Sequence, residues 1–123
     1  MMSKVDHFLE CFFHPRSVAI VGATNNPFKM NFRLTQNLLD LNFQGKIYPV
    51  NPREKKISGI KAYATLRDIS KGIDLVVIAV PAPKALDIIK DCDKKGVKQV
   101  VIVTGGILTL AIQPRRPQQN PMT

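Results

Sequence analysis

The residues of this sequence best suited to chemistry follow the short apolar run Val18 to Val21. The chain breaks at Gly22 and continues through a polar loop into a segment with helical spacing. A buried strand that ends at glycine and leads into a helix brings backbone N–H groups and the positive end of a helix dipole together. Such a corner favours an anion, and we expect it to hold the phosphates of a nucleotide-like cofactor. Its candidate residues are Gly22, Ala23, Thr24, Asn25, Asn26, Pro27 and Lys29.

Further candidate residues follow the other predicted strands. Because the carboxyl ends of parallel strands meet at one edge of a sheet, we expect these residues to join the corner. The basic side chains among them would complement phosphate charge. The set comprises Asn51, Pro52, Arg53 and Lys55 after the second predicted strand, Val80, Pro81 and Ala82 after the fourth, and Thr104 and Gly105 after the fifth.

Side chains for covalent or acid–base catalysis are not grouped in this sequence. The two histidines, His7 and His14, both precede the first predicted strand. No Ser/His/Asp or Cys/His pattern and no pair of carboxylates converges on the expected site. The two cysteines, Cys11 and Cys92, are far apart and match no metal or redox spacing, so we expect inert thiols. We therefore predict no catalytic and no metal-binding residue.

The elements that position the candidate residues alternate between strands and helices. Their short connections are typical of right-handed parallel crossovers. The continuous apolar run at 74–80 indicates a parallel strand that is covered on both faces. We predict an α/β fold, a Rossmann-like doubly wound parallel sheet of five strands in the order 3-2-1-4-5. The predicted strands are 17–21, 46–50, 61–63, 74–80 and 99–104, and the predicted helices are 4–13, 28–41 and 84–95.

Two of these helices carry an apolar stripe that we expect to face the sheet. The spacing of the apolar residues, three or four apart, is that of one helix face. In helix 28–41 the stripe comprises Leu34, Leu38 and Leu41, and in helix 84–95 it comprises Leu86, Ile89 and Cys92.

Length and composition favour one soluble domain. The chain has 123 residues, of which 45% are hydrophobic, and a net charge of +9. No apolar run approaches the roughly 18–20 residues that span a bilayer, and the N-terminus lacks the apolar core of a signal peptide, so we expect a cytoplasmic protein. We assign residues 1–106 to the Rossmann-like domain. Residues 107–112 suit a last strand or a helical turn, and we expect 107–123 to form an atypical, disordered C-terminal tail.

Two alternative functions remain open at this point. The net charge favours anionic partners, but no nucleic-acid recognition motif is present, so a nucleic-acid binder would be non-specific. An NAD(P)-binding Rossmann domain would carry G-x-G-x-x-G after the first strand and an acidic residue at the end of the second. Here A-T-N-N-P follows Gly22, and the first acid after the second strand is Glu54.

Three motifs in order resemble a known family. They are F-F-H-P-R-S-V-A-I-V-G-A-T-N-N-P at 12–27, K-I-Y-P-V-N-P at 46–52 and D-L-V-V-I-A-V-P-A at 74–82. Together they resemble the coenzyme A (CoA)-binding domain that opens the ADP-forming acyl-CoA (acetyl-CoA) synthetases and the succinyl-CoA ligase α subunit, and that also exists as small stand-alone CoA-binding proteins. The resemblance covers about residues 12–106. It implies that the domain 1–106 binds CoA or an acyl-CoA.

The resemblance also implies roles for individual residues. The loop Thr24–Pro27 would wrap the phosphates and pantetheine, and Arg53 or Lys55 would meet the nucleotide end. The corner Val80–Ala82 and the strand end Thr104–Gly105 would border the pantetheine arm.

The family's ligases use a phosphohistidine and an ATP-grasp domain, which this chain lacks, so we expect a non-catalytic module that is not active alone. The expected partner is a ligase subunit or a second copy of the chain, and not a membrane. The unusual tail suggests either a truncated or frame-shifted ligase or a genuine stand-alone module.

Overall fold

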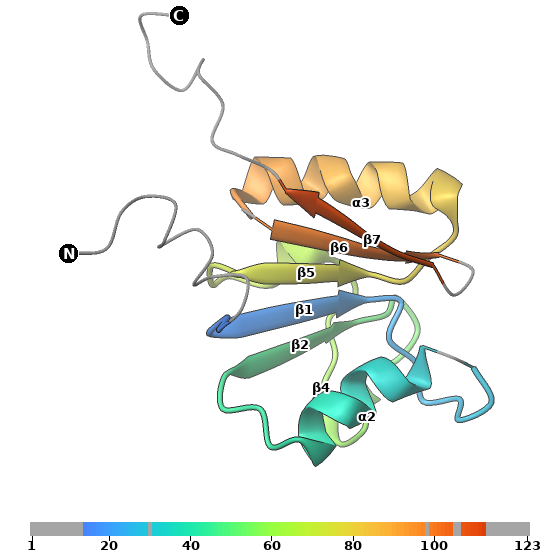
Figure 1. The fold of residues 1–123 in the computed structure, drawn as a ribbon. Helices are drawn as coiled ribbons and strands as arrows, with labels where there is room; N and C mark the ends of the chain where they lie inside the picture. Colours follow the sequence, from blue (N-terminus) through green and yellow to red (C-terminus); the bar gives the residue numbers. More distant parts are fainter. Residues whose placement is uncertain (1–13, 30, 98, 105–106, 113–123) are drawn as a thin grey trace, which may run out of the picture.

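The computed structural model describes residues 14–29, 31–97, 99–104 and 107–112 of the chain. Its main sheet has the order β2-β1-β5-β6-β7 (Figure 1). The first four strands in that order are mutually parallel, and β7 pairs antiparallel with β6. The predicted α/β fold with a parallel sheet is therefore confirmed. The strands are β1 (Ser17–Val21), β2 (Lys46–Val50), β5 (Leu75–Ile78), β6 (Gln99–Thr104) and β7 (Ile107–Ile112).

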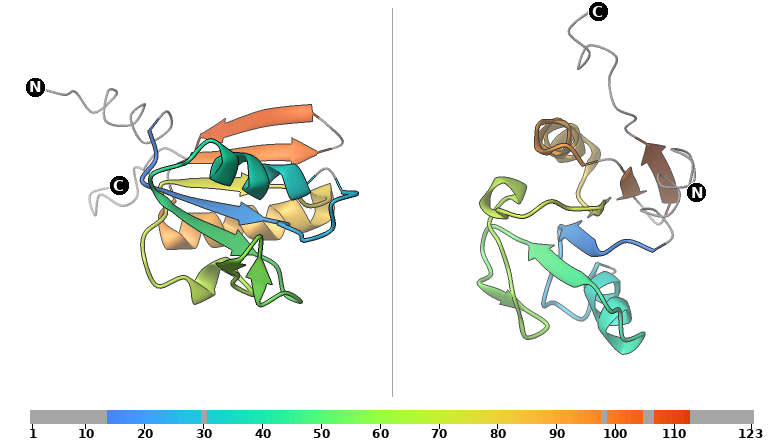
Figure 2. Two further views of the ribbon diagram at one scale, coloured as in Figure 1. Left: turned by 90° about the horizontal axis from the view of Figure 1, so that it is seen from below. Right: turned by 90° about the vertical axis from the view of Figure 1, so that its left-hand side faces the viewer.

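Two helices, α2 (Phe32–Asp40) and α3 (Ala82–Lys95), cover opposite faces of this sheet (Figure 2). Cys92 of α3 belongs to the apolar cluster on one face, and Leu38 of α2 packs against the cluster on the other. Because both faces are covered, β1 is buried along its whole length, as a central parallel strand requires. The carboxyl ends of β1, β2, β5 and β6 point toward one edge, where the candidate residues lie.

The predicted strand 61–63 is not a full strand of the main sheet, so the order 3-2-1-4-5 is not confirmed. Two short strands, β3 (Lys56–Ile57) and β4 (Ile60–Lys61), instead form a separate antiparallel hairpin. Tyr63 makes an isolated parallel bridge to Val50 in β2. The fifth place in the sheet is taken by β7 at the opposite edge.

A proline explains why the third strand stops at one bridge. The Tyr63 N–H donates to the Pro49 carbonyl at 2.9 Å, and the Asn51 N–H donates to the Tyr63 carbonyl at 2.9 Å. To continue this parallel pairing toward Lys61, the next hydrogen bond would need an N–H at residue 49. Proline lacks that donor, so β2 remains an edge strand along its first residues.

Helix α2 begins four residues later than predicted. Residues 26–29 form a turn instead, in which the Asn26 Oδ1 accepts the Phe28 N–H at 3.0 Å and the Asn26 carbonyl accepts the Lys29 N–H at 3.1 Å. The helix ends at Asp40, so Leu41 is 79% exposed and does not belong to the buried stripe, contrary to the prediction.

Helix α3 begins at Ala82, two residues earlier than predicted, with Pro83 in its first turn. Its buried face is formed by Ala85 and Cys92, with Ile88 and Ile89 packed between them. Leu86 lies about 100° around the helix from Ala85 and is 63% exposed, which corrects its assignment to the buried stripe.

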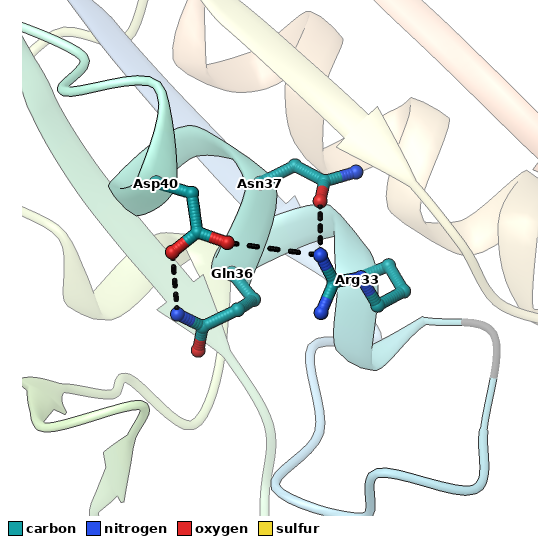
Figure 3. A network of polar contacts seen from close by, with 4 residues as sticks. All are labelled: Arg33, Gln36, Asn37 and Asp40. Carbon is teal, nitrogen blue, oxygen red and sulfur yellow. Dashed lines mark hydrogen bonds and ion pairs between the residues drawn. The ribbon is translucent and has the colours of Figure 1, made fainter.

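The solvent face of α2 carries a network of polar side chains within the one helix (Figure 3). Arg33 donates to the Asn37 Oδ1 at 2.9 Å and forms an ion pair with Asp40 at 3.7 Å. Gln36 donates to the Asp40 Oδ1 at 3.0 Å. The side chains of the ion pair are 57% and 55% exposed, so water competes with the pair.

Some predictions concern residues whose structure is not described. The predicted helix 4–13, Gly105 and the part 113–123 of the predicted tail lie outside the described residues. Among the helices that are described, none has the length and apolar character needed to cross a membrane.

Candidate functional site

The chain turns at Gly22, directly after β1 and beside the end of β5. Gly22 has a φ of +96°, and a Cβ there would lie 2.5 Å from the Ala79 carbonyl oxygen. The Gly22 N–H donates to the Val50 carbonyl at 3.1 Å, and the Ala79 N–H donates to the Val21 carbonyl at 2.8 Å. The ends of β1, β2 and β5 therefore meet at a point where the positive φ and the close approach both require glycine.

Asn31 closes this corner and was missed by the sequence analysis. Its Nδ2 donates to the Gly22 carbonyl at 3.2 Å and to the Ala79 carbonyl at 2.7 Å. It precedes α2 in the N-cap position but makes no capping hydrogen bond with its side chain. Because Asn31, Thr35 and Leu38 share one helix face and Thr35 is fully buried, a polar residue at 31 signals a tertiary hydrogen bond.

Asn51 joins the loop after β2 to the loop after β1. Its Nδ2 donates to the Ala23 carbonyl at 2.9 Å. Its Oδ1 accepts the Arg53 N–H at 2.7 Å and the Glu54 N–H at 3.3 Å. The side-chain amide is thus engaged in shaping the corner, so this predicted site residue acts on the position of the two loops.

Asn25 makes a second connection, to the β3–β4 hairpin. Its Nδ2 donates to the Lys56 carbonyl at 2.8 Å and lies 3.4 Å from the Glu54 carboxylate. Its Oδ1 accepts the Ser58 N–H at 3.0 Å. Both ends of this predicted site side chain therefore contact the protein itself.

The rest of the loop after β1 is ordered by its own polar groups. The Thr24 Oγ1 accepts the Asn26 N–H at 3.1 Å, and Asn26 in turn holds the backbone of residues 28 and 29. For the backbone N–H groups of Thr24 and Asn25, no acceptor is found within the described residues. These two donors, in the loop that leads from β1 to α2, are available to an anion.

Exposed cations lie in the two loops that meet at the corner. Lys29 lies in the first loop, and Arg53 and Lys55 follow β2, each exposed to solvent. Lys56 carries a further charge at the start of β3. Glu54 is the acid within this basic segment, and its carboxylate is the one near Asn25. The net charge of these loops is positive, which favours a phosphorylated ligand.

The other predicted site residues lie at the ends of their strands. Pro52 is exposed between Asn51 and Arg53. The backbone at Val80 and Pro81 leads from β5 into α3, which begins at Ala82, and the Pro81 carbonyl accepts the N–H groups of residues 84 and 85. Thr104 ends β6.

Two other features lie away from the corner. Burial, with a smaller contribution from Asp91, raises the pKa of the Cys92 thiol from 9.0 to about 12, so the thiol is protonated at neutral pH and inert, as predicted. A cavity of about 450 Å³ lies beside the open edge of β2, with Lys46, Tyr48, Lys61 and Tyr63 in its walls. None of the predicted site residues lines this cavity.

Comparison with known proteins identifies a family. The family described as "CoA binding domain" matches residues 16–120 of the chain. This range includes the corner at Gly22, the basic segment after β2 and the end of β5.

Two curated relatives are ADP-forming ligases. The chain is 42% identical over 112 residues to the acetate–CoA ligase [ADP-forming] II subunit alpha of Pyrococcus furiosus, covering 91% of this chain and 24% of the relative. It is 44% identical over 101 residues to the acetate–CoA ligase [ADP-forming] of Methanocaldococcus jannaschii, covering 82% of this chain and 14% of the relative. The chain therefore spans a quarter or less of the length of these relatives.

Solved structures agree with this similarity. A dinucleotide-forming acetyl-coenzyme A synthetase 1 from Ca. Korarchaeum cryptofilum, in complex with phosphate and ADP, is 41% identical with a TM-score of 0.76, covering 80% of this chain and 21% of that chain. A conserved hypothetical protein from Pyrococcus furiosus is 33% identical with a TM-score of 0.68, covering 75% of this chain and 78% of that chain.

Proposed function

This chain belongs to the CoA binding domain family, and on that premise we propose that it binds coenzyme A at the corner that begins at Gly22. The observation that carries the proposal is the pair of backbone N–H groups of Thr24 and Asn25, for which no acceptor is found within the described residues. They follow the turn at Gly22, where the Ala79 carbonyl and the Val80 side chain fill the space that a Cβ would take. Free backbone donors in such a loop can contact the oxygens of a diphosphate.

The pyrophosphate of CoA is bound by main-chain donors rather than by asparagine side chains. The side chains of Asn25 and Asn51 already bond to the protein, whereas the N–H groups of Thr24 and Asn25 have no acceptor within the described residues. Two adjacent N–H groups near a helix amino end form a site for a phosphate oxygen. Thr24, Asn26 and Pro27 keep this loop in shape.

The two ends of the ligand extend in opposite directions from the corner. The adenosine end, with its 3′-phosphate, meets the cations Arg53 and Lys55 after β2. The pantetheine arm runs toward Val80–Ala82, which follow β5, and toward Thr104 at the end of β6. Pantetheine is neutral and amide-rich, and suits the backbone around Pro81 better than it suits the basic segment.

We assign this chain a binding role without catalysis of its own. Its curated relatives are ligases of which it spans a quarter or less, so the remaining chemistry of an acyl-CoA ligase would come from a partner subunit or from further sequence. A ligase subunit is the partner favoured by the similarity to a subunit alpha, and a second copy of the chain is the alternative. Family membership does not favour an NAD(P)-binding domain or a nucleic-acid binder.

Calorimetric titration with CoA tests the proposal. We expect saturable binding in the micromolar range, about −8 kcal/mol. Asn26→Asp keeps the acceptor for the Phe28 N–H but adds a negative charge to the loop, and should weaken CoA binding about tenfold. Asn37→Asp is the matched control, because it adds the same charge on the solvent face of α2, where Arg33 already donates to residue 37.

The pair of variants separates a local effect from a change in net charge. Equal weakening by both substitutions would locate the ligand elsewhere on the surface. Absence of heat with millimolar CoA, or tighter binding of NADH than of CoA, would refute the proposed function.

A further inference from the structure

Three hydrogen bonds are among the contacts that hold the basic segment after β2 in place. The Arg53 N–H donates to the Asn51 Oδ1 at 2.7 Å, and the Lys55 carbonyl accepts the Ala62 N–H at 2.8 Å. The Lys56 carbonyl accepts the Asn25 Nδ2 at 2.8 Å. The third contact differs from the others because its donor comes from the loop after β1.

The hairpin that begins at Lys56, the end of this segment, has a tight turn. Lys56 pairs with Lys61 and Ile57 with Ile60, and the two turn residues, Ser58 and Gly59, both have positive φ. This is the two-residue turn that matches the twist of a β-hairpin. Ile57 is fully buried and anchors the hairpin to the α2 face of the core.

Asn25 reaches both strand and turn of this hairpin. Its Nδ2 bonds to β3 at the Lys56 carbonyl, and its Oδ1 bonds to the turn at the Ser58 N–H. These bonds join residues 31 and 33 positions apart. One exposed side chain thus connects the proposed diphosphate loop to the segment that carries Arg53, Lys55 and Lys56.

We propose that Asn25 is a positioning residue that sets the preference for CoA over dephospho-CoA. It does so by holding the basic segment after β2 (Arg53, Lys55 and Lys56) against the loop after β1, which is the proposed diphosphate loop. This inference rests on the proposed function. CoA and dephospho-CoA share the pyrophosphate and differ in the 3′-phosphate, so a change confined to the basic segment alters their relative affinity. A fixed cation binds a phosphate more strongly than one on a mobile loop, because less conformational freedom is lost on binding.

The experiment measures the ratio of the two dissociation constants for wild type and Asn25→Ala. Wild type should bind CoA about tenfold more tightly than dephospho-CoA, the value expected for one charge-assisted contact. Asn25→Ala should reduce this ratio to about twofold or threefold, because the affinity for CoA falls more than the affinity for dephospho-CoA. Because Asn25 is exposed and Ile57 still anchors the hairpin, the variant is expected to fold.

Asn37→Ala is the matched control, since it removes an exposed asparagine that accepts a hydrogen bond at 2.9 Å within α2. It should leave both affinities and their ratio unchanged. Amide hydrogen exchange in the ligand-free protein gives a second readout. The Ser58 N–H should exchange faster in Asn25→Ala than in wild type, and not in Asn37→Ala.

The outcomes distinguish the inference from the proposed function. An equal loss of affinity for both ligands would mean that Asn25 only maintains the diphosphate loop, and would overturn the inference alone. An unchanged ratio or unchanged Ser58 exchange would do the same. If wild type binds neither ligand, the proposed function and this inference both fail.

Discussion

The corner at Gly22 and the solvent face of α2 both use asparagine side chains, yet the two networks connect different parts of the chain. On α2, Arg33 and Asn37 are four residues apart, and every member of the network belongs to one helix (Figure 3). At the corner, Asn31 bonds to a carbonyl 48 residues away and Asn51 to one 28 residues away. The network on α2 joins residues that the helix backbone already holds close together. The network at the corner instead fixes the positions of separate segments relative to one another.

This difference predicts different consequences of substitution. Exposed hydrogen bonds and ion pairs four residues apart stabilise a helix by about 0.2–0.5 kcal/mol. A partly buried hydrogen bond between distant segments contributes more, about 0.5–1.5 kcal/mol, and its loss leaves acceptors without a partner. The corner should therefore be sensitive to substitution and the face of α2 tolerant.

The largest effect is expected at Gly22 itself. Gly22→Ala forces a Cβ to within 2.5 Å of the Ala79 carbonyl oxygen at a φ of +96°, and should lower the free energy of unfolding by about 3–4 kcal/mol. Denaturant titration measures this loss. Gly59→Ala is the control, because its φ of +81° is similar but no atom lies within 4 Å of the added Cβ.

Gly59→Ala should lower the free energy of unfolding by about 1–2 kcal/mol, which is the cost of placing a residue with a Cβ at a positive φ. Equal losses at the two glycines would show that the close approach to β5 adds nothing, and the corner would no longer differ from a surface turn.

An intermediate loss of stability is expected for substitutions of Asn31, and we expect the aspartate variant to be less stable than the alanine variant. Asn31→Ala removes donation to two carbonyls and should cost about 1–2 kcal/mol. Asn31→Asp should cost more, because a carboxylate would face the Gly22 and Ala79 carbonyl oxygens. Thermal or denaturant unfolding at pH 7 ranks the two variants.

Helix rules alone give the opposite ranking, since aspartate is a favourable residue at a helix amino end. An Asp variant more stable than the Ala variant would therefore mean that residue 31 serves α2 locally, as the residues of Figure 3 do.

The smallest effect is expected on the solvent face of α2. Arg33→Ala should change the free energy of unfolding by no more than about 0.5 kcal/mol, because its partner Asp40 is 55% exposed. Arginine in the first turn and aspartate in the last also oppose the helix dipole, which offsets the gain from pairing. If Arg33→Ala lowered the free energy of unfolding by more than about 1 kcal/mol, this network would contribute as much to stability as a hydrogen bond at the corner, contrary to the expectation.

Much of the fold follows from local patterns of residues. The bounds of β1, β2 and β6 match the predicted strands 17–21, 46–50 and 99–104. The uninterrupted apolar run at 74–80 predicted a strand covered on both faces, and it contains β5. The corner at Gly22 was predicted because a glycine at a strand end has a specific conformational use. The three motifs placed the chain in its family before any contact was known.

Other features were predictable but not predicted. Pro49 within K-I-Y-P-V indicates an edge strand, because a central strand needs the N–H that proline lacks. Asn31 lies on the buried face of α2, where a polar side chain needs a partner. Leu41 and Leu86 were assigned to buried stripes from spacing alone, although the end of one helix and the phase of the other leave them exposed.

The local conformation of this chain follows from short stretches of sequence. The spacing of apolar residues indicates a helix or a strand, and proline and glycine restrict the backbone within a few positions. The partners of its polar side chains are not encoded in this way. Asn25, Asn31 and Asn51 have the same amide, and only packing of β1, β2 and β5 brings each within hydrogen-bonding distance of a carbonyl from another segment. The tertiary structure therefore brings the side chains of two predicted site residues, Asn25 and Asn51, onto backbone groups of other segments. In the proposed function, the contact with phosphate is made by the backbone.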